Sequence, residues 1–271
     1  MSHDNFKQNK DDVVTTTPKA KGKGKRNKQS ADQNNYQSND NGQNYKFSPR
    51  NEEQREMFYA MEKNDLVFAT GPAGTGKTHV AVAKAVEDFK SGRVKKIILS
   101  RPAVEAEGER IGFLPGTKEQ KIAPYMQPLY DELDNILGMD ARKKMMESGL
   151  IEIVPLSFLR GRTLSDAFII LDEAQNATKG QMKMVLSRAG KNSKIAVTGD
   201  LNQNDLPENV TSGLEDAVER FSKVSRASVL ELKKIVRSEL ADIVVNAYEG
   251  QDSSMKSAPS PRNANANTPK R

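Results

Sequence analysis

A glycine-rich segment at residues 71–78 reads GPAGTGKT, so three glycines, a lysine and two threonines stand within eight positions. The apolar run 66–70 leads into it, and the helix-forming run 80–86 follows it. Glycines in this strand–loop–helix context let successive N–H groups curl around phosphate oxygens, and the helix N-terminus adds partial positive charge. The segment therefore predicts a binding site for the phosphates of a nucleoside triphosphate.

The loop also supplies two side chains with expected chemical tasks. Lys77 is expected to reach the β- and γ-phosphates and to assist their transfer, and the Thr78 hydroxyl to ligate Mg²⁺. The backbone of the loop is expected to hold the phosphates. The residues predicted to bind the nucleotide here are Gly71, Pro72, Ala73, Gly74, Thr75, Gly76, Lys77 and Thr78.

Two adjacent acids follow an apolar run at residues 167–175, which read AFIILDEAQ. A parallel strand would deliver them to its C-terminal edge, where ligands of such sheets bind. There Asp172 would hold the Mg²⁺ and Glu173 would orient or deprotonate the attacking water. Taken alone, the pattern is that of a strand entering a loop. Together with the glycine-rich segment, it favours hydrolysis.

A third apolar run, residues 194–198, continues as GDLNQ. This places the carboxylate of Asp200 and the amide of Gln203 at the same predicted edge, where we expect them to sense the γ-phosphate. The alternative is an ordinary exit from a strand through a Gly-Asp turn. The two other motifs favour a role for Asp200 and Gln203 in sensing the γ-phosphate.

The elements that must position these residues alternate along the chain. Short apolar runs alternate with longer helical stretches, which predicts βα units and an α/β fold with a mainly parallel sheet flanked by helices. The expected strands are 65–70, 95–100, 150–154, 167–172, 194–198 and 228–232. The expected helices are 51–63, 77–91, 124–137, 179–189, 213–221 and 233–248.

Polar segments at both ends bound this pattern. Residues 1–50 and 251–271 contain too few apolar side chains to form a core, so we expect disordered tails around one domain at 51–250. Residues 19–28 of the first tail read KAKGKGKRNK. This run is either a solvated arm that aids solubility or an electrostatic arm for RNA or DNA.

The composition of the 271 residues narrows the possible classes of protein. With 36% hydrophobic residues the chain can bury a core, and its net charge of +6 favours polyanionic partners. Because the chain contains no cysteine, disulfides and thiolate metal sites are excluded. It also has no apolar run that could span a bilayer and no signal-peptide pattern, so we expect a cytoplasmic protein without membrane contact.

Several motifs, in this order, resemble the PhoH-like ATPase family over roughly residues 51–250. They are GPAGTGKT at 71–78, SRP at 100–102, GFLPG at 112–116, FIILDEAQN at 168–176, QMKM at 181–184 with Arg188, TGD at 198–200 and QNDLP at 203–207. The resemblance implies a RecA-like P-loop fold related to the first motor domain of superfamily 1 helicases. It also implies Mg²⁺-dependent ATP binding and hydrolysis, with a role on RNA. The trimmed core with variable tails resembles a phage copy, whose cytoplasm would be that of the host.

The same resemblance implies two further site residues. Gln54 would contact the adenine edge, as the helicase Q-motif glutamine does; alternatively it is a solvent-facing helix residue. Arg237 corresponds to a late arginine that would reach the γ-phosphate of a neighbouring subunit, which implies a homo-oligomeric ring such as a hexamer. Here the sequence departs from the family, because LELKK precedes this arginine and Ser-Glu follows it. Arg237 could equally be a surface charge.

The segment 103–121 and His79 remain open from sequence. Arg110, Lys118 and Lys121 would face nucleic acid in a helicase-like protein, or are solvated loop charges, since only Phe113 and Tyr125 lie nearby for base stacking. His79 has no partner nearby in sequence, which favours a core or surface histidine over a metal ligand.

Three functions fit these motifs to different degrees. The first is an ATPase coupled to RNA or DNA. The second is a nucleotide-gated RNA-binding protein with little turnover. The third is a P-loop kinase, which the adjacent acids and the Asp200–Gln203 segment disfavour. Clustered carboxylates with two-metal spacing, which a nuclease would need, are not found in the sequence.

Overall fold

The computed structural model describes residues 45–102, 118–207, 209–236, and positions 240, 241, 243, 244 and 247, with the backbone alone for 118–122. The sequence patterns produce a six-stranded sheet in the order β3-β2-β4-β5-β1-β6, in which every neighbouring pair is parallel. The strands are β1 (Leu66–Thr70), β2 (Lys96–Arg101), β3 (Ile151–Pro155), β4 (Ala167–Leu171), β5 (Lys194–Gly199) and β6 (Ala227–Glu231). All six predicted strands are present, with ends that shift by at most one residue.

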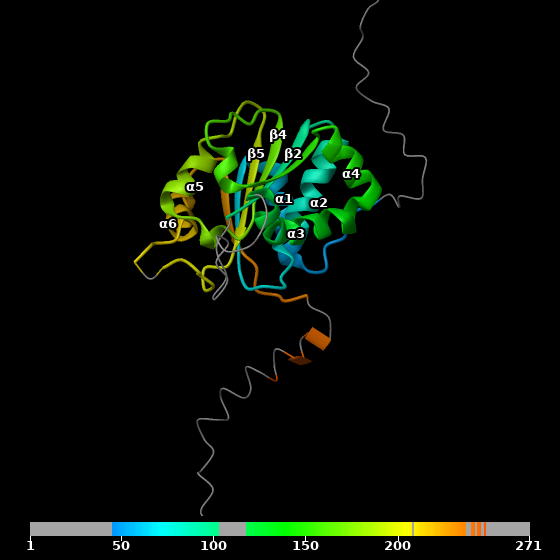
Figure 1. The fold of residues 1–271 in the computed structure, drawn as a ribbon. Helices are drawn as coiled ribbons and strands as arrows, with labels where there is room; N and C mark the ends of the chain where they lie inside the picture. The colour runs from blue at the N-terminus through cyan, green and yellow to red at the C-terminus, as the bar shows by residue number, and fades with distance from the viewer. Residues whose placement is uncertain are drawn as a thin grey trace, which may run out of the picture. The chain divides into compact units, whose positions relative to one another are not determined.

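Helices cover both faces of this sheet, as Figure 1 shows. On one face lie α1 (Glu52–Lys63), α2 (Lys77–Lys90), α3 (Lys118–Leu137) and α4 (Met139–Glu147). On the other lie α5 (Lys179–Leu186) and α6 (Gly213–Phe221). The short 3₁₀ turns η2 (Leu156–Leu159) and η3 (Ala174–Asn176) follow β3 and β4. The strand that leads into the glycine-rich loop and the strand that carries the acids are separated by β5 alone. This is the RecA-like P-loop α/β fold that the sequence predicted.

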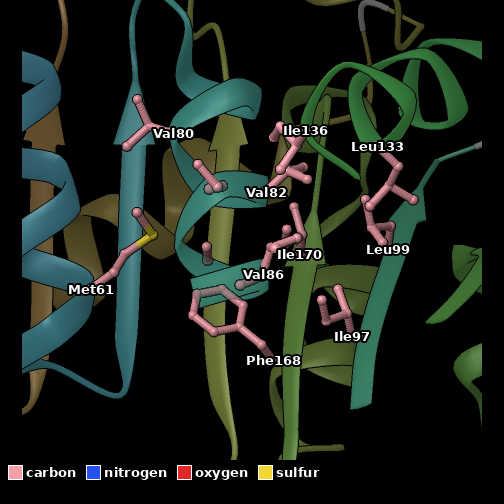
Figure 2. Packing of buried hydrophobic residues seen from close by; sticks show 14 of the residues in the cluster. Met61, Val80, Val82, Val86, Ile97, Leu99, Leu133, Ile136, Phe168 and Ile170 are labelled. Carbon is pink, nitrogen blue, oxygen red and sulfur yellow. The ribbon is translucent and has the colours of Figure 1, made fainter. Parts of the chain in front are cut away.

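The helix α2 forms the centre of the larger core. Its apolar residues Val80, Val82 and Val86 are buried, and Figure 2 shows Val82 and Val86 beside Ile170 and Phe168 of β4. Burial of each such side chain contributes about 1.5–3 kcal/mol to folding. The helix that begins at the glycine-rich loop is therefore packed tightly against the sheet.

The helix α3 begins earlier than predicted. The sequence placed its start at Pro124, because proline is favoured in the first turn of a helix. The structure begins it at Lys118 and keeps Pro124 and Pro128 inside it. Each internal proline removes one helical hydrogen bond, and burial of Leu129 and Leu133 in the core offsets that loss.

Two further segments differ from the prediction. The helix α4 was not predicted, because only one of its side chains, Met145, is buried, and its sequence shows little apolar periodicity. The predicted helix 233–248 does not begin at Lys233. Residues 233–236 are not helical, and the N–H of Val236 donates to the Gly74 carbonyl at 2.8 Å. This segment, residues 232–236, forms a strap across the glycine-rich loop.

In addition to the Val236 hydrogen bond, the strap is anchored at two other places. The N–H of Leu232 donates to the Thr70 carbonyl at 2.8 Å, which prolongs the pairing of β6 with β1. The N–H groups of Lys233 and Lys234 both donate to one carboxylate oxygen of Glu53 in α1, each at 2.8 Å. These bonds give the N–H groups of the strap acceptors outside any helix, so residues 233–236 adopt a non-helical conformation.

Residues before α1 also join the core. Tyr45 and Phe47 lie ahead of the domain start expected at Asn51, yet both pack against the larger cluster, and Phe47 stacks on Phe58 with ring centroids 4.6 Å apart. Among the described helices, none combines the length and apolar character needed to cross a membrane.

Candidate nucleotide site

The sheet order brings the three predicted motifs together. The central strands β4, β5 and β1 are neighbours and run parallel, so their C-terminal ends meet at one edge of the sheet. The glycine-rich loop follows β1, the two acids follow β4, and Asp200 follows β5. The expectation that all three would share one edge is therefore met by the fold.

The loop itself depends on two of its glycines. Gly71 has a φ of +135°, and a Cβ there would lie 1.9 Å from the carbonyl oxygen of Leu232 in the strap. Gly76 has a φ of +84°, and its Cβ would lie 2.5 Å from the side-chain nitrogen of Gln54. Both positions combine an unfavourable backbone conformation for other residues with a close neighbour. The loop is thus held between the strap and α1.

Lys77 folds back onto the loop that carries it. Its Nζ donates to the carbonyls of Gly71 at 2.6 Å and Pro72 at 2.9 Å. Burial lowers the pKa of Lys77, an effect that the nearby carboxylates of Asp200 and Glu173 oppose. The ammonium group is therefore held at the loop by neutral acceptors, which a phosphate oxygen can replace.

The Asp172 carboxylate meets the Thr78 hydroxyl, although the two residues are far apart in sequence. Thr78 Oγ1 donates to Asp172 Oδ1 at 2.8 Å, and Thr198 Oγ1 of β5 donates to the same oxygen at 2.6 Å. Asp172 is only 4% exposed. Burial raises the pKa of its carboxyl, the charge of Glu173 raises it further, and the Thr198 hydrogen bond opposes both.

Glu173 lies next to Asp172 in the left-handed region, with φ of +50°. One carboxylate oxygen forms an ion pair with the guanidinium of Arg101 at 2.8 Å, and the other accepts a hydrogen bond from the side-chain amide of Gln175. Non-glycine residues in this backbone region concentrate at functional sites, because neighbouring structure must hold them there.

Gln175 links the acidic motif to the third motif. Its amide nitrogen donates to Glu173, while its Oε1 accepts from the backbone N–H of Asp200 at 3.1 Å. Asp200 is buried, and Gln203 is exposed at the rim. The backbone N–H of Gln203 donates to the Asp200 carbonyl at 3.3 Å, so the sensor segment turns back over the site.

A cavity of about 260 Å³ lies among these groups. It brings together nine residues predicted from the sequence and three that were not. The predicted lining residues are Ala73, Gly74, Gly76, Lys77, Thr78, Asp172, Glu173, Asp200 and Gln203. The others are His79, Glu132 and Gly199.

A second cavity, of about 250 Å³, adjoins the other side of the loop. It shares Gly74, Gly76 and His79 with the first, and Gln54, Arg50 and Val236 also line it. Gln54 is not the solvent-facing residue of the alternative interpretation, because it is only 2% exposed. Its Oε1 accepts from the Arg50 N–H, and its Nε2 donates to the Thr75 carbonyl, both at 2.9 Å.

His79 has partners that the sequence did not reveal. Its Nδ1 lies 2.5 Å from a carboxylate oxygen of Glu132 in α3, and its Nε2 lies 2.8 Å from the Tyr45 hydroxyl. Neither partner stands in a motif, and each is more than thirty residues away along the chain, so no local pattern could have identified them. Arg101 and Gln175, by contrast, stand within the quoted SRP and DEAQN motifs.

Some predicted site residues lie outside the described residues. These are Arg237, Arg110 and Phe113, together with the side chains of Lys118 and Lys121. Tyr125, one of the two aromatic residues considered for base stacking, instead packs against the larger core with its hydroxyl buried.

The fold and site together define a class of protein. A parallel sheet with a glycine-rich loop at the start of α2 and an acid paired with the loop threonine is the arrangement of the P-loop nucleoside triphosphatases. The model of the PhoH-like protein family matches residues 46–249. The chain belongs to this family.

Relatives extend across several bacterial groups. The chain is 54% identical over 201 residues to the PhoH-like protein of Bacillus subtilis strain 168, which covers 73% of this chain and 63% of the relative. It is 45% identical over 203 residues to Protein PhoH of Escherichia coli K12, which covers 73% of this chain and 57% of the relative. The chain thus spans less than two thirds of the length of these curated relatives.

Solved structures share only a general likeness. The Pif1 helicase from Candida albicans has a TM-score of 0.40 at 16% identity, covering 77% of this chain and 48% of that one. The UvsW helicase from bacteriophage T4 has a TM-score of 0.42 at 12% identity, covering 69% of this chain and 61% of that one. Likeness of this degree carries no functional inference.

Proposed function

We propose that this protein binds ATP and hydrolyses it with the help of Mg²⁺. The observation that carries the proposal is the 2.8 Å contact between the Thr78 hydroxyl and the Asp172 carboxylate beside the loop cavity. The two residues stand 94 positions apart in the chain. A loop that only cradled phosphate would need no such partner.

The chemistry of this pair fits a magnesium ion. Mg²⁺ prefers oxygen ligands and is commonly held in phosphate sites by one or two protein oxygens, with water and phosphate completing its shell. Thr78 and Asp172 would hold the ion, which would neutralise charge on the β- and γ-phosphates. Lys77 would exchange its carbonyl partners for phosphate oxygens, because an anion attracts an ammonium group more strongly than a carbonyl does.

Glu173 would act as the general base. Its carboxylate lines the cavity beside Asp172, close enough to the loop to order a water molecule on the γ-phosphate side. Asp200 and Gln203 line the same cavity and would contact the γ-phosphate. A carboxylate for water, rather than a pocket for an acceptor, favours hydrolysis over a kinase reaction.

We propose that the adenine base of ATP binds in the second cavity. Gln54 forms part of its wall, and we propose that this side chain contributes to adenine binding from there. Val236 lines the same cavity, so the strap would contribute to the nucleotide site as well.

Nucleic-acid coupling and oligomer formation complete the proposal. The net charge of +6 and the basic run at 19–28 support binding to RNA or DNA in the cytoplasm. Exposed apolar side chains near the proposed finger Arg237, namely Ile235, Leu240, Ile243 and Val244, support packing against a second copy in a ring. Such a ring would let Arg237 reach the γ-phosphate of the next subunit.

Replacement of Glu173 tests the chemical step. Glu173→Gln should still bind ATP but should release phosphate about 100-fold more slowly, because an amide cannot accept the proton of water. Phosphate release is measured with ATP and water alone, and binding with a fluorescent nucleotide. Glu152→Gln is the matched control, since Glu152 lies on β3 and pairs with Arg162.

Two results would reject the proposal. Equal rates in the parent and in Glu173→Gln would leave only a nucleotide-gated binding protein. A parent that forms ADP only when an acceptor is added, and then transfers the phosphoryl group to it without releasing phosphate, would indicate a kinase. Repeating the assay with single-stranded RNA, duplex RNA and DNA at several salt concentrations, alongside a mass measurement in solution, tests the coupling and the ring.

A further inference from the structure

The proposed general base is held by two groups of its own chain. Arg101 Nη2 lies 2.8 Å from one carboxylate oxygen of Glu173, and the side-chain amide of Gln175 donates to the other oxygen. Each oxygen therefore already has one hydrogen-bond donor, although a carboxylate oxygen can accept a second. A general base must take a proton from water at one of these oxygens, in competition with the donors that already hold it.

The direction of the Arg101 contact is also significant. Arg101 ends β2, and β2 lies on the far side of β4 from β5 and β1 in the sheet order. The P-loop follows β1. The guanidinium therefore contacts the Glu173 carboxylate from the β2 side of β4, opposite the side on which the loop lies.

Arg101 is itself firmly placed. Its Nη1 donates to the carbonyl of Tyr125 in α3 at 3.3 Å, and its Nε lies 3.9 Å from Asp172. In the part of the chain that the structure describes, Arg101 is not among the residues that line the loop cavity. It would therefore act on hydrolysis through Glu173 rather than by touching the phosphates.

The pair is accessible enough to open. The side chain of Arg101 is 20% exposed and that of Glu173 is 37% exposed. An ion pair with this exposure is weaker than a fully buried one, because water competes for both partners. Its opening would not require unfolding of the surrounding sheet.

We propose that Arg101 is a positioning residue that holds Glu173 in a resting arrangement and so restrains basal ATP turnover. The inference rests on the proposed function, in which Glu173 is the general base. Turnover then requires the Arg101 ion pair to open, so that one Glu173 oxygen turns toward water. Removal of the guanidinium should increase the rate of the chemical step and leave nucleotide binding unchanged.

The test compares Arg101→Met, Arg101→Lys and the parent full-length chain in steady-state phosphate release over a range of ATP concentrations. Arg101→Met should raise kcat about fivefold, the amount expected for loss of a partly exposed ion pair. KM should stay within about twofold, because Arg101 touches no nucleotide in the proposed site. Arg101→Lys restores a positive charge and should return kcat toward the parent value.

A double variant and a matched control make the result specific. In a Glu173→Gln background, Arg101→Met should have no effect on the residual rate, because the group through which it acts is gone. Arg162→Met removes an arginine from a comparable ion pair, 2.7 Å from Glu152, and should leave kcat at the parent value. If Arg101→Met does not fold, Arg101→Gln, which keeps a donor for the Tyr125 carbonyl, gives the same comparison.

The outcomes separate this inference from the proposed function. An unchanged or lower kcat in a folded Arg101→Met protein would overturn the inference while Glu173→Gln remained slow. An equal effect of Arg101→Met with and without Glu173 would also overturn it. By contrast, a Glu173→Gln protein as fast as the parent would reject the proposed function itself.

Discussion

The helix α2 carries two lysines whose surroundings differ: Lys84 is buried and Lys77 is half-buried. Lys84, about two turns beyond Lys77, is fully buried, and its Nζ lies 2.8 Å from Asp88 and 3.1 Å from Glu87, with Glu62 also in contact. Burial would lower the pKa of Lys84, but the hydrogen bonds with Asp88 and Glu62 outweigh that effect and raise it. Lys77 instead meets backbone carbonyls, and burial lowers its pKa.

The difference separates a structural charge from a functional one. The charge of Lys84 is already neutralised by carboxylates, which Arg93 also joins, so this cluster has little affinity left for a ligand. The Nζ of Lys77 donates to neutral oxygens of the loop, and the carboxylates of Asp200 and Glu173 lie near it without accepting these hydrogen bonds. Even a half-buried cation such as Lys77 loses part of its hydration, and a bound anion would compensate for that loss. In the proposed function, that anion is the triphosphate.

Replacement of Lys77 should have the largest effect on activity. Lys77→Met should lower phosphate release about 1,000-fold, since it removes the positive charge expected on the transferred phosphate. The melting temperature of the nucleotide-free protein should stay the same or rise, because a half-buried charge is removed. Lys90→Met, on an exposed residue of the same helix, should change neither quantity. A normal rate in Lys77→Met would remove the contrast between the two lysines.

Replacement of Lys84 should show the opposite pattern. Lys84→Met should lower the free energy of unfolding by about 3 kcal/mol, because it leaves the buried carboxylate of Asp88 with one fewer cation. Chemical denaturation measures this loss, again beside Lys90→Met. Below the denaturation transition, phosphate release per folded molecule should match the parent. A large loss of activity with unchanged stability would show that the cluster has more than a structural role.

Replacement of Gly71, which lies beside the strap, should lower the stability by less than replacement of Lys84. Gly71→Ala should lower the free energy of unfolding by about 2 kcal/mol, because the added methyl meets the Leu232 carbonyl and the backbone conformation is unfavourable. Gly92→Ala is the matched control: its φ of +75° is also unfavourable, but no atom lies within 4 Å of the added carbon. Equal losses of unfolding free energy in the two variants would mean that the close contact between Gly71 and the Leu232 carbonyl does not contribute.

Exposed charges on the opposite face should matter least. Asp216 in α6 pairs with Arg220 and Lys179, whose hydrogen bonds lower the pKa of its carboxyl to about 2. Because the folded pKa lies below the usual 3.8, the pair's contribution to stability is present above pH 3.8 and lost as the pH falls through about 2. Asp216→Asn should therefore melt slightly below the parent at neutral pH and at the same temperature near pH 2. A difference that persists in strong acid would contradict this origin.

Sequence patterns were sufficient for the parts of the molecule with local signals. All six strands followed from apolar runs, and nine of the lining residues of the loop cavity followed from three motifs. The motifs also indicated that Thr78 and Asp172 would come together, since both were expected to ligate the same Mg²⁺, and they lie in contact. The pairing of Glu132 with His79 did not follow, because it forms only when α2 and α3 pack together. The non-helical strap was missed for a similar reason, since Glu53 and Gly74 accept its backbone N–H groups and no side-chain pattern reveals this.

The strap has a mechanical consequence for the whole molecule. Residue 236 donates its N–H to the Gly74 carbonyl in the middle of the phosphate loop, and the chain continues from there toward its C-terminus. The end of β6 and the glycine-rich loop are therefore linked by a few backbone hydrogen bonds. A displacement of Val236 would shift Gly74 first, which in the proposed function is one of the residues that hold the phosphates.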